Sequence, residues 1–304
     1  MRIYVGVTDS NWYEQLSKSG SDEVNFWTPS GRSFKALKEN ELFLFKLHSP
    51  NNYIVGGGFF VKYTLLPAFL AWDAFKEKNG TKSYDELKRR IQKYRGIEEI
   101  DANTQIGCIV LTEPFWFDRS QWIPVPEWHN NIVSGRGYST DNEVGRKLFD
   151  DVQERIADIQ ILSQASILPT SSRYSETLTK HRLGQGGFRV AVTEAYQRRC
   201  AITGEKTLPV LEAAHIKPFA ENGEHAVSNG ILLKSDFHTL FDKGYITLTN
   251  DYKIEVSHRL HDDFGNGRDY YKYQGQKILI LPESISQRPD VIALEWHQNN
   301  VFLG

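Results

Sequence analysis

Residues 211–245 read LEAAHIKPFAENGEHAVSNGILLKSDFHTLFDKGY, and this stretch decides the fold of the second half of the chain. The short apolar run at 209–216 predicts a β-strand, and the run NGILL at 229–233 predicts a second one. A turn-rich segment with an Asn-Gly pair lies between them. A short helix is expected at 237–243, where Gly244 ends it. The stretch therefore predicts a β-hairpin followed by a helix.

Three polar residues fall at defined places on this unit: His215 near the end of the first strand, Asn229 at the start of the second, and His238 in the helix. Hydrolysis of a phosphodiester needs a base that takes a proton from water, and a histidine with a pKa near ~6.5 suits this at neutral pH. It also needs a cation that offsets the charge on phosphate. His238 can bind that cation, and Asp242, four residues later, shares its helix face. Asn229 can hold the loop after His215 by hydrogen bonds, so the pattern predicts a one-metal site for phosphodiester cleavage.

The segments AHIKP (214–218) and NGILLKSDFHTLFDKGYITL (229–248) resemble the HNH nucleases, in particular the subgroup found in many bacterial restriction-type proteins. The lead-in at 182–204 is also similar to that family, so the resemblance extends from there to the C-terminus. It implies a ββα-metal fold and a divalent metal, with Mg²⁺ favoured and Mn²⁺ or another transition metal as alternatives. It also implies three roles, which are listed here: general base, His215; middle asparagine, Asn229; histidine on the metal side, His238.

Two departures from the family pattern concern metals. Many HNH proteins carry an Asp or His ligand just before the base, where this chain has Ala214. Glu212, Asp236 or Asp242 could complete the site instead, and the sequence leaves all three open. Many HNH domains also hold a structural zinc on two Cys-x-x-Cys pairs. Cys200 has no such partner and the chain has only two cysteines, so no structural zinc is expected.

The composition indicates the cellular compartment of the protein and the kind of partner it can bind. Two cysteines in 304 residues fit reduced core thiols, and the first residues lack the pattern of a secretory leader. No stretch approaches the ~20 apolar residues of a membrane span, so we expect a cytoplasmic protein without a membrane partner. The net charge is −2, so a DNA-binding surface needs local segregation of charge.

Such segregation occurs at 173–206, where seven Lys or Arg accompany three acidic residues. A helix is expected at 187–199, with its apolar residues facing a core. Arginines that remain outside that core are suited to contact phosphates. The candidate DNA-binding residues are Arg182, Arg189, Arg198 and Arg199.

Domain boundaries follow from a long helical pattern at 144–167 and a Ser/Thr/Gly-rich stretch after it. We expect a first domain at 1–160, a linker at 161–180 and a nuclease domain at 181–304. The first domain shows mixed β pattern with helices, so the fold class is α+β. The expected elements are strands at 1–8, 42–49, 53–63 and 106–117 and a basic helix at 83–95.

The segments NFWTPSGRSFKAL (25–37) and ELFLFKLHSPNNYIVGGGFF (41–60) are similar to the PUA-like superfamily, which includes the ASCH, EVE and SRA domains. That resemblance implies a β-barrel with helices that holds a modified or flipped base in an aromatic cage. Trp27 is the first candidate for the cage because it stands beside turn residues rather than inside a predicted strand. The other candidates for this modified-base pocket are Asn25, Arg32 and Tyr63.

Together these observations predict a metal-dependent DNA endonuclease of restriction type that acts on double-stranded DNA carrying modified cytosine. Two other classes stay open: a non-catalytic reader of modified nucleic acid, and an RNA-directed enzyme, since PUA-like domains also occur in RNA-modifying proteins. Cutting both strands with one site per chain would call for two chains, so a homodimer is a further expectation.

Overall fold

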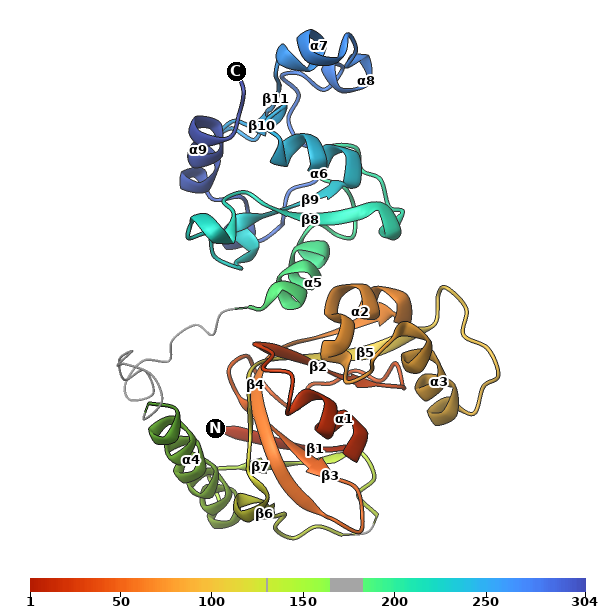
Figure 1. The fold of residues 1–304 in the computed structure, drawn as a ribbon, viewed down its shortest axis with the longest axis vertical. Helices are drawn as coiled ribbons and strands as arrows, with labels where there is room; N and C mark the ends of the chain where they lie inside the picture. The colour runs from red at the N-terminus through yellow and green to blue at the C-terminus, as the bar shows by residue number, and fades with distance from the viewer. Residues whose placement is uncertain (130, 165–182) are drawn as a thin grey trace. The chain divides into compact units, whose positions relative to one another are not determined.

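The computed structural model describes residues 1–129, 131–164 and 183–304. The chain divides into two compact units, Met1–His181 and Arg182–Gly304, and each is described by itself (Figure 1). Strands and helices occur in both units, which confirms the α+β class. Most of the expected linker at 161–180, and Arg182, lie outside the described residues. In the part of the chain that is described, no helix is long and apolar enough to cross a membrane.

The first unit is built on one mixed sheet with the strand order β2-β5-β4-β3-β1-β7, and β6 pairs with β4. Only β1 and β3 run parallel; the other neighbours are antiparallel. Among the described strands β2 and β7 remain at the two ends of the path, so the sheet is open. The β-barrel that the sequence resemblance implied is therefore wrong for the described residues, because the two end strands do not pair with each other. The strands are β1 (Arg2–Thr8), β2 (Glu23–Thr28), β3 (Leu42–Leu47), β4 (Tyr53–Pro67), β5 (Gln105–Trp116), β6 (Ile123–Pro124) and β7 (Gly135–Ser139).

Both faces of this sheet are buried, because β3 alternates between two hydrophobic cores. Leu42 and Leu44 face a core that includes Val152 of α4 (Glu143–Gln164), whereas Phe43 and Phe45 face a core that includes residues of α1 (Ser10–Leu16). Side chains alternate between the two faces of a strand, so α1 and α4 cover opposite faces.

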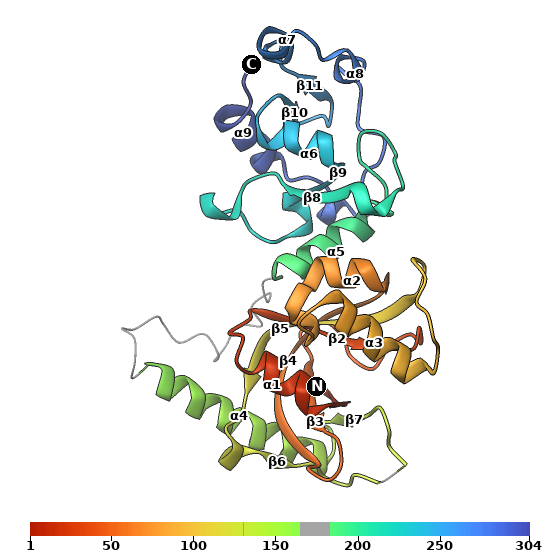
Figure 2. The same cartoon turned by 45° about the vertical axis from the view of Figure 1, so that its right-hand side comes forward.

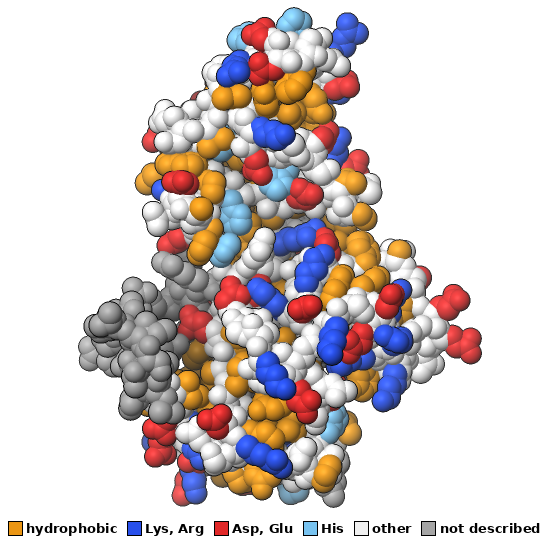
Figure 3. All heavy atoms as spheres, in the orientation of Figure 1, with side chains coloured by type: hydrophobic (Ala, Val, Ile, Leu, Met, Phe, Trp, Pro, Cys, Tyr) orange, Lys and Arg blue, Asp and Glu red, His pale blue; other side chains and the backbone are white. Residues whose placement is uncertain are grey.

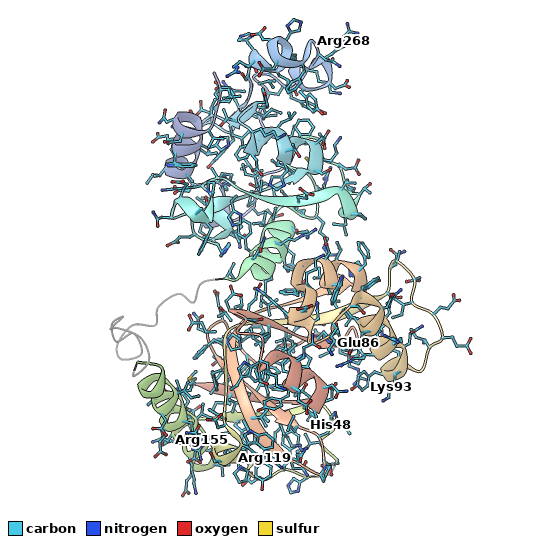
Figure 4. The ribbon with its side chains drawn as sticks, in the orientation of Figure 1. His48, Glu86, Lys93, Arg119, Arg155 and Arg268 are labelled. Atoms are coloured by element: carbon cyan, nitrogen blue, oxygen red, sulfur yellow. The ribbon has the colours of Figure 1, made fainter. Side chains whose placement is uncertain are left out.

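Helices at the edges of this unit are held by polar contacts. Arg155 of α4, labelled in Figure 4, donates from its guanidinium Nε to the carbonyl of Gln121 at 2.8 Å. The basic helix predicted at 83–95 is α3 (Tyr84–Arg95), where Ser83 caps the first turn by accepting from the backbone N–H of Glu86. The remaining described helices of this unit are α2 (Ala68–Phe75) and the 3-10 turns η1 (Lys76–Asn79) and η2 (Arg119–Gln121).

The prediction about the place of Trp27 in this unit was also wrong. Trp27 lies inside β2, a strand that was not expected, and its Cα pairs with that of Cys108 in β5. The segment EVNFWT has the aromatic and β-branched content of a strand, but its proximity to Pro29-Ser30-Gly31 favoured a turn. Pairing with β5 outweighs that local signal, because the strand gains a full ladder of hydrogen bonds.

The second unit has its own core, which the small hairpin β8 (Leu211–His215) and β9 (Gly230–Lys234) shares with the helices around it. Helix α6 (Ser235–Asp242) follows β9 directly and lies beside the hairpin in both views (Figures 1 and 2). The remaining described α-helices and strands are α5 (Gln185–Ala195), β10 (Ile246–Leu248), β11 (Ile254–Val256), α7 (Arg259–Phe264), α8 (Arg268–Tyr271) and α9 (Val291–Asn300).

Helix α5 reaches the hairpin at a position where only glycine fits. A Cβ on Gly230 would come within 2.5 Å of Val192 and 2.9 Å of Phe188, both buried residues of α5. The absence of a side chain therefore lets α5 pack directly on the start of β9. Gly230 pairs with His215 across the hairpin, so this contact also brings Phe188 to the end of β8.

Candidate active site

His215 lies at the end of β8 between an aromatic ring and a second histidine. Its imidazole stacks on Phe188, with ring centroids 3.9 Å apart and an interplanar angle of 12°. Its Nε2 is 2.9 Å from Nδ1 of His225. Burial, followed by the neighbouring His225, lowers the pKa of His215 from 6.5 to about 4. The ring is therefore neutral at pH 7, the state in which a histidine can accept a proton.

Asn229 closes the loop that follows His215. Its side-chain oxygen accepts from the backbone N–H of Lys217, and its amide nitrogen donates to the carbonyls of Lys217 and Glu224, each at 2.9 Å. The side chain is buried, so these bonds are shielded from water. One amide thereby joins two points of the loop to the start of β9.

His238 lies between two carboxylates on the hairpin and the helix. Its Nδ1 is 2.6 Å from Oε2 of Glu212 in β8, and its Nε2 is 3.2 Å from Oδ2 of Asp242, one helical turn later. Burial by itself would lower the pKa of His238, but the hydrogen bonds with Asp242 and Glu212 outweigh it and raise the pKa above 6.5. On the face drawn in Figure 3, histidine side chains of this unit lie among acidic and hydrophobic ones.

The structure distinguishes between the three carboxylates that the sequence left as alternatives for the metal site. Glu212 and Asp242 contact His238, whereas Asp236 accepts from Lys234 Nζ at 3.0 Å and from the Tyr270 hydroxyl at 3.5 Å. Asp236 is thus engaged on the other side of α6.

The acidic cluster around His238 offers two protein ligands to one cation. Among the residues described, no three His, Cys, Asp or Glu side chains are grouped so that they could hold a metal ion. The reason is geometric: the two nitrogens of His238 point away from each other, so Glu212 and Asp242 lie at different sides of the ring. His238 Nε2 and Asp242 Oδ2 can share an ion, while Glu212 accepts from Nδ1–H, the arrangement by which carboxylates commonly orient metal-binding histidines.

The candidate DNA-binding arginines have mixed positions. Arg189 lies on α5, and Arg198 and Arg199 lie in the turn after it, where Arg198 has a φ of 57°. All three side chains are half-buried, and Nε of Arg199 is buried without a hydrogen-bond partner among the described residues. Arg182 lies outside the described residues.

The four candidates for a base pocket do not meet at one point. Asn25 and Trp27 both donate to Asn79, to its side-chain oxygen at 2.8 Å and its carbonyl at 3.0 Å. Tyr63 instead donates to the carbonyl of Arg32 at 2.7 Å. Directly paired residues share a face of a sheet, and the register aligns Tyr63 with the Phe26 row rather than the Trp27 row. The candidates therefore form two separate pairs.

Two residues beside His215 were not identified as site residues from the sequence. Phe188 was expected only as a core residue, and His225 was not singled out. His225 lies in the loop, where no periodicity marks it, ten positions after His215. Its position four residues before Asn229 in the loop between β8 and β9 was the available signal.

Comparison with known proteins bears on both units. Residues 200–249 match a family model described as HNH_2, HNH endonuclease, which confirms the HNH resemblance for that segment. None of the curated proteins matches the chain.

Two solved structures illustrate the remaining similarity. ASCH from Zymomonas mobilis aligns with a TM-score of 0.34 and 9% identity, over 49% of this chain and 94% of that one. A structure described as a modification-dependent TagI restriction endonuclease aligns with a TM-score of 0.29 and 12% identity, over 98% of this chain and 81% of that one. Both scores are low, and the assignment of the second unit depends on the family model.

Proposed function

We propose that this protein is a metal-dependent DNA endonuclease of restriction type, which cuts DNA that carries modified cytosine. Residues 200–249 form an HNH endonuclease domain. The observation that supports the proposal best is the pair of histidines in that domain. His215 is kept neutral, and His238 lies between Glu212 and Asp242. A base and a cation-binding group side by side are what phosphodiester hydrolysis requires.

In this proposal His215 takes a proton from water, and the resulting hydroxide attacks phosphorus. Asn229 keeps the loop after His215 in place, so the imidazole holds its orientation. His238 and Asp242 would hold the divalent cation, and Glu212 would orient His238. When bound, that ion would offset negative charge on the phosphate and the leaving oxygen.

The donor set of this site is mixed. The carboxylate suits Mg²⁺ or Mn²⁺ and the imidazole suits a transition metal, and one of each leaves most coordination positions to water and phosphate oxygens. Cys200, the one cysteine of the domain, is buried and accepts from the backbone N–H groups of Thr203 and Lys234 through Sγ, each at 3.4 Å. Its sulfur is thereby occupied within the core.

We assign recognition of the modified base to the first unit, with Trp27 as the leading pocket residue and Asn25 beside it. The indole N–H of Trp27 donates to the carbonyl of Asn79, and the Tyr94 ring lies beside the indole with centroids 6.1 Å apart. In this proposal the modified base stacks on the indole ring of Trp27. A Trp27→Ala variant that stays folded should lose the preference for modified DNA while still cutting. Equal preference in variant and wild type, measured with matched plasmids, would remove Trp27 from the pocket. Arg32→Ala is the matched control, because that exposed side chain lies in the other pair.

The test of the whole proposal is cleavage of one plasmid in three forms: unmodified, with 5-methylcytosine, and with 5-hydroxymethylcytosine. Each form is incubated with Mg²⁺, Mn²⁺ or EDTA. We expect cutting of a modified form only, and loss of cutting in EDTA. Equal cutting of all three forms would keep the nuclease and reject the modified-cytosine preference. No cutting with either metal would reject the endonuclease in favour of a non-catalytic reader. A parallel RNA substrate separates an RNA-directed enzyme, because the 2′-hydroxyl and helix form differ.

A further inference from the structure

The backbone of His225 is held in place by hydrogen bonds on both sides of this residue. The carbonyls on both sides of it are hydrogen-bonded to Asn229: that of Glu224 to the amide side chain and that of Ala226 to the backbone N–H, each at 2.9 Å. The loop is also tight, because a Cβ on Gly223 would come within 1.9 Å of the carbonyl of Lys217. The backbone of His225 is therefore fixed relative to the end of β8.

The ring of His225 is fixed as well. On one side its Nδ1 is 2.9 Å from Nε2 of His215, and on the other its ring stacks on Phe219, with centroids 4.7 Å apart and an angle of 9°. Phe188 stacks on a face of His215 and also lies near the His225 ring, with centroids 5.7 Å apart. The four rings form one cluster that extends from α5 to the exposed Phe219. Neither imidazole can turn without breaking a stack or the hydrogen bond.

The hydrogen bond between the two imidazoles restricts their tautomers. Two neutral rings that share one N–H···N bond have one donor and one acceptor. If His225 donated, the proton of His215 would sit on Nδ1, and its only lone pair, on Nε2, would be occupied. His215 could then accept nothing further. If His215 donates from Nε2, its Nδ1 lone pair is left for a proton from water.

We propose that His225 is a positioning residue that accepts the Nε2–H of His215 and so keeps the Nδ1 of His215 as the nitrogen that takes a proton. This inference rests on the proposed function of His215 as the base. In the step itself an O–H bond of water breaks, an N–H bond forms at Nδ1 of His215, and hydroxide is left to attack phosphorus. The resulting imidazolium keeps its Nε2–H bond to His225, which becomes charge-assisted and therefore stronger.

Three variants of the full chain separate the hydrogen bond from the packing. His225→Asn keeps an acceptor close to the position of Nδ1. His225→Gln carries the same amide one carbon further out, and His225→Phe keeps the stack on Phe219 without any acceptor. In single-turnover cleavage at saturating DNA and metal, we expect the Asn variant within a few fold of wild type. The Phe and Gln variants should be slower by roughly 10²-fold, the lower range for loss of acid–base catalysis. DNA affinity should be unchanged in all three.

A second readout does not depend on cleavage. In ¹⁵N NMR of the metal-free protein with labelled histidine, wild-type His215 should carry its proton on Nε2, and the Phe variant should show a mixture of tautomers. A wild-type His215 protonated on Nδ1 overturns the inference, and so does a Phe variant that cuts as fast as wild type. If wild type cuts no DNA but the tautomer changes in the Phe variant, the positioning role stands and the proposed endonuclease fails.

Discussion

At the scale of single residues, the pKa values of two half-buried histidines in one small domain are shifted in opposite directions. Burial and a histidine neighbour lower the pKa of His215, whereas two carboxylates raise that of His238 against the effect of burial. Opposite pKa shifts of two nearby titratable groups are common in active sites, where the groups have different roles in acid–base catalysis. Neither pKa shift can be predicted from the spacing of the motif, because each depends on the side chains that lie beside the histidine in the folded protein.

Replacing His215 tests the base directly. His215→Ala should lower the cleavage rate by about 10²- to 10⁴-fold, because water loses its proton acceptor. Folding and DNA affinity should change little. The measurement is single-turnover cleavage together with a DNA-binding isotherm, and His261→Ala, at an exposed histidine of α7, is the control. Undiminished cleavage by the His215 variant would exclude it as the base.

Asn229 should matter for stability as well as for cleavage. Asn229→Ala removes three buried hydrogen bonds and leaves the loop groups of Lys217 and Glu224 without their partner, at a cost of about 1–3 kcal/mol. Asn229→Asp should cost more above neutral pH, where a carboxylate would face two carbonyls. Urea unfolding measures both, with the exposed Asn250→Ala as control. A cost for Asn229→Ala no larger than that of the control would contradict this account.

At the scale of elements, the sequence located the hairpin and the following helix of the second unit to within a few residues. It did not identify α7, α8 and α9 of that unit, or α1, α2, β2, β6 and β7 of the first. The strands expected at 209–216 and 229–233 are β8 and β9, and the helix expected at 237–243 is α6. Apolar pattern and Gly244, with its φ of 77°, were sufficient there. Strand β2 was missed because turn residues follow it and its ladder partner, β5, comes about 80 residues later in the chain. In the tail, residues 277–281 form no strand; Lys277 makes an isolated bridge with Lys253.

The packing of α9 on α6 should make the second unit sensitive to acid. His297 of α9 is buried, stacks on Phe241, and bonds the Thr247 hydroxyl and the Phe241 carbonyl. Burial lowers its pKa from 6.5 to about 4. The unfolded chain therefore binds more protons between those values. The stability from this group is complete above pH 6.5 and is lost as pH falls toward 4, by about 3 kcal/mol.

Urea unfolding at several pH values between 4 and 7 measures this loss. His297→Gln keeps hydrogen-bonding groups but cannot titrate, so it should show a shallower dependence by about one proton. His215 contributes in the same direction in both proteins and so cancels in the comparison. An identical slope for variant and wild type would contradict the burial argument.

At the scale of the whole molecule, each unit has its own hydrophobic core. The core of the second unit draws its buried residues from Phe188 to Leu294, and the two cores of the first draw theirs from Ile3 to Ile156. Among the described residues no core cluster contains members from both units. Each unit can therefore be tested by itself.

A fragment of residues 183–304 should therefore fold on its own. It retains its complete core, so we expect a cooperative thermal transition and native near-ultraviolet circular dichroism. If the proposed division of labour is correct, the fragment should also bind metal but lose the preference for modified DNA. A fragment that lacks fixed tertiary packing would show that the first unit is needed for the fold.

The sequence by itself determined the α+β class, the hairpin and helix at 209–243, and the HNH resemblance that the family model confirms over 200–249. Periodicity, turn residues and motif spacing are local properties, so they can be read along the chain. Only the tertiary structure decided that Glu212 and Asp242, rather than Asp236, contact His238, and that His225 meets His215. Those contacts depend on how strands, helix and loop pack in space, and sequence spacing does not specify side-chain direction across a fold.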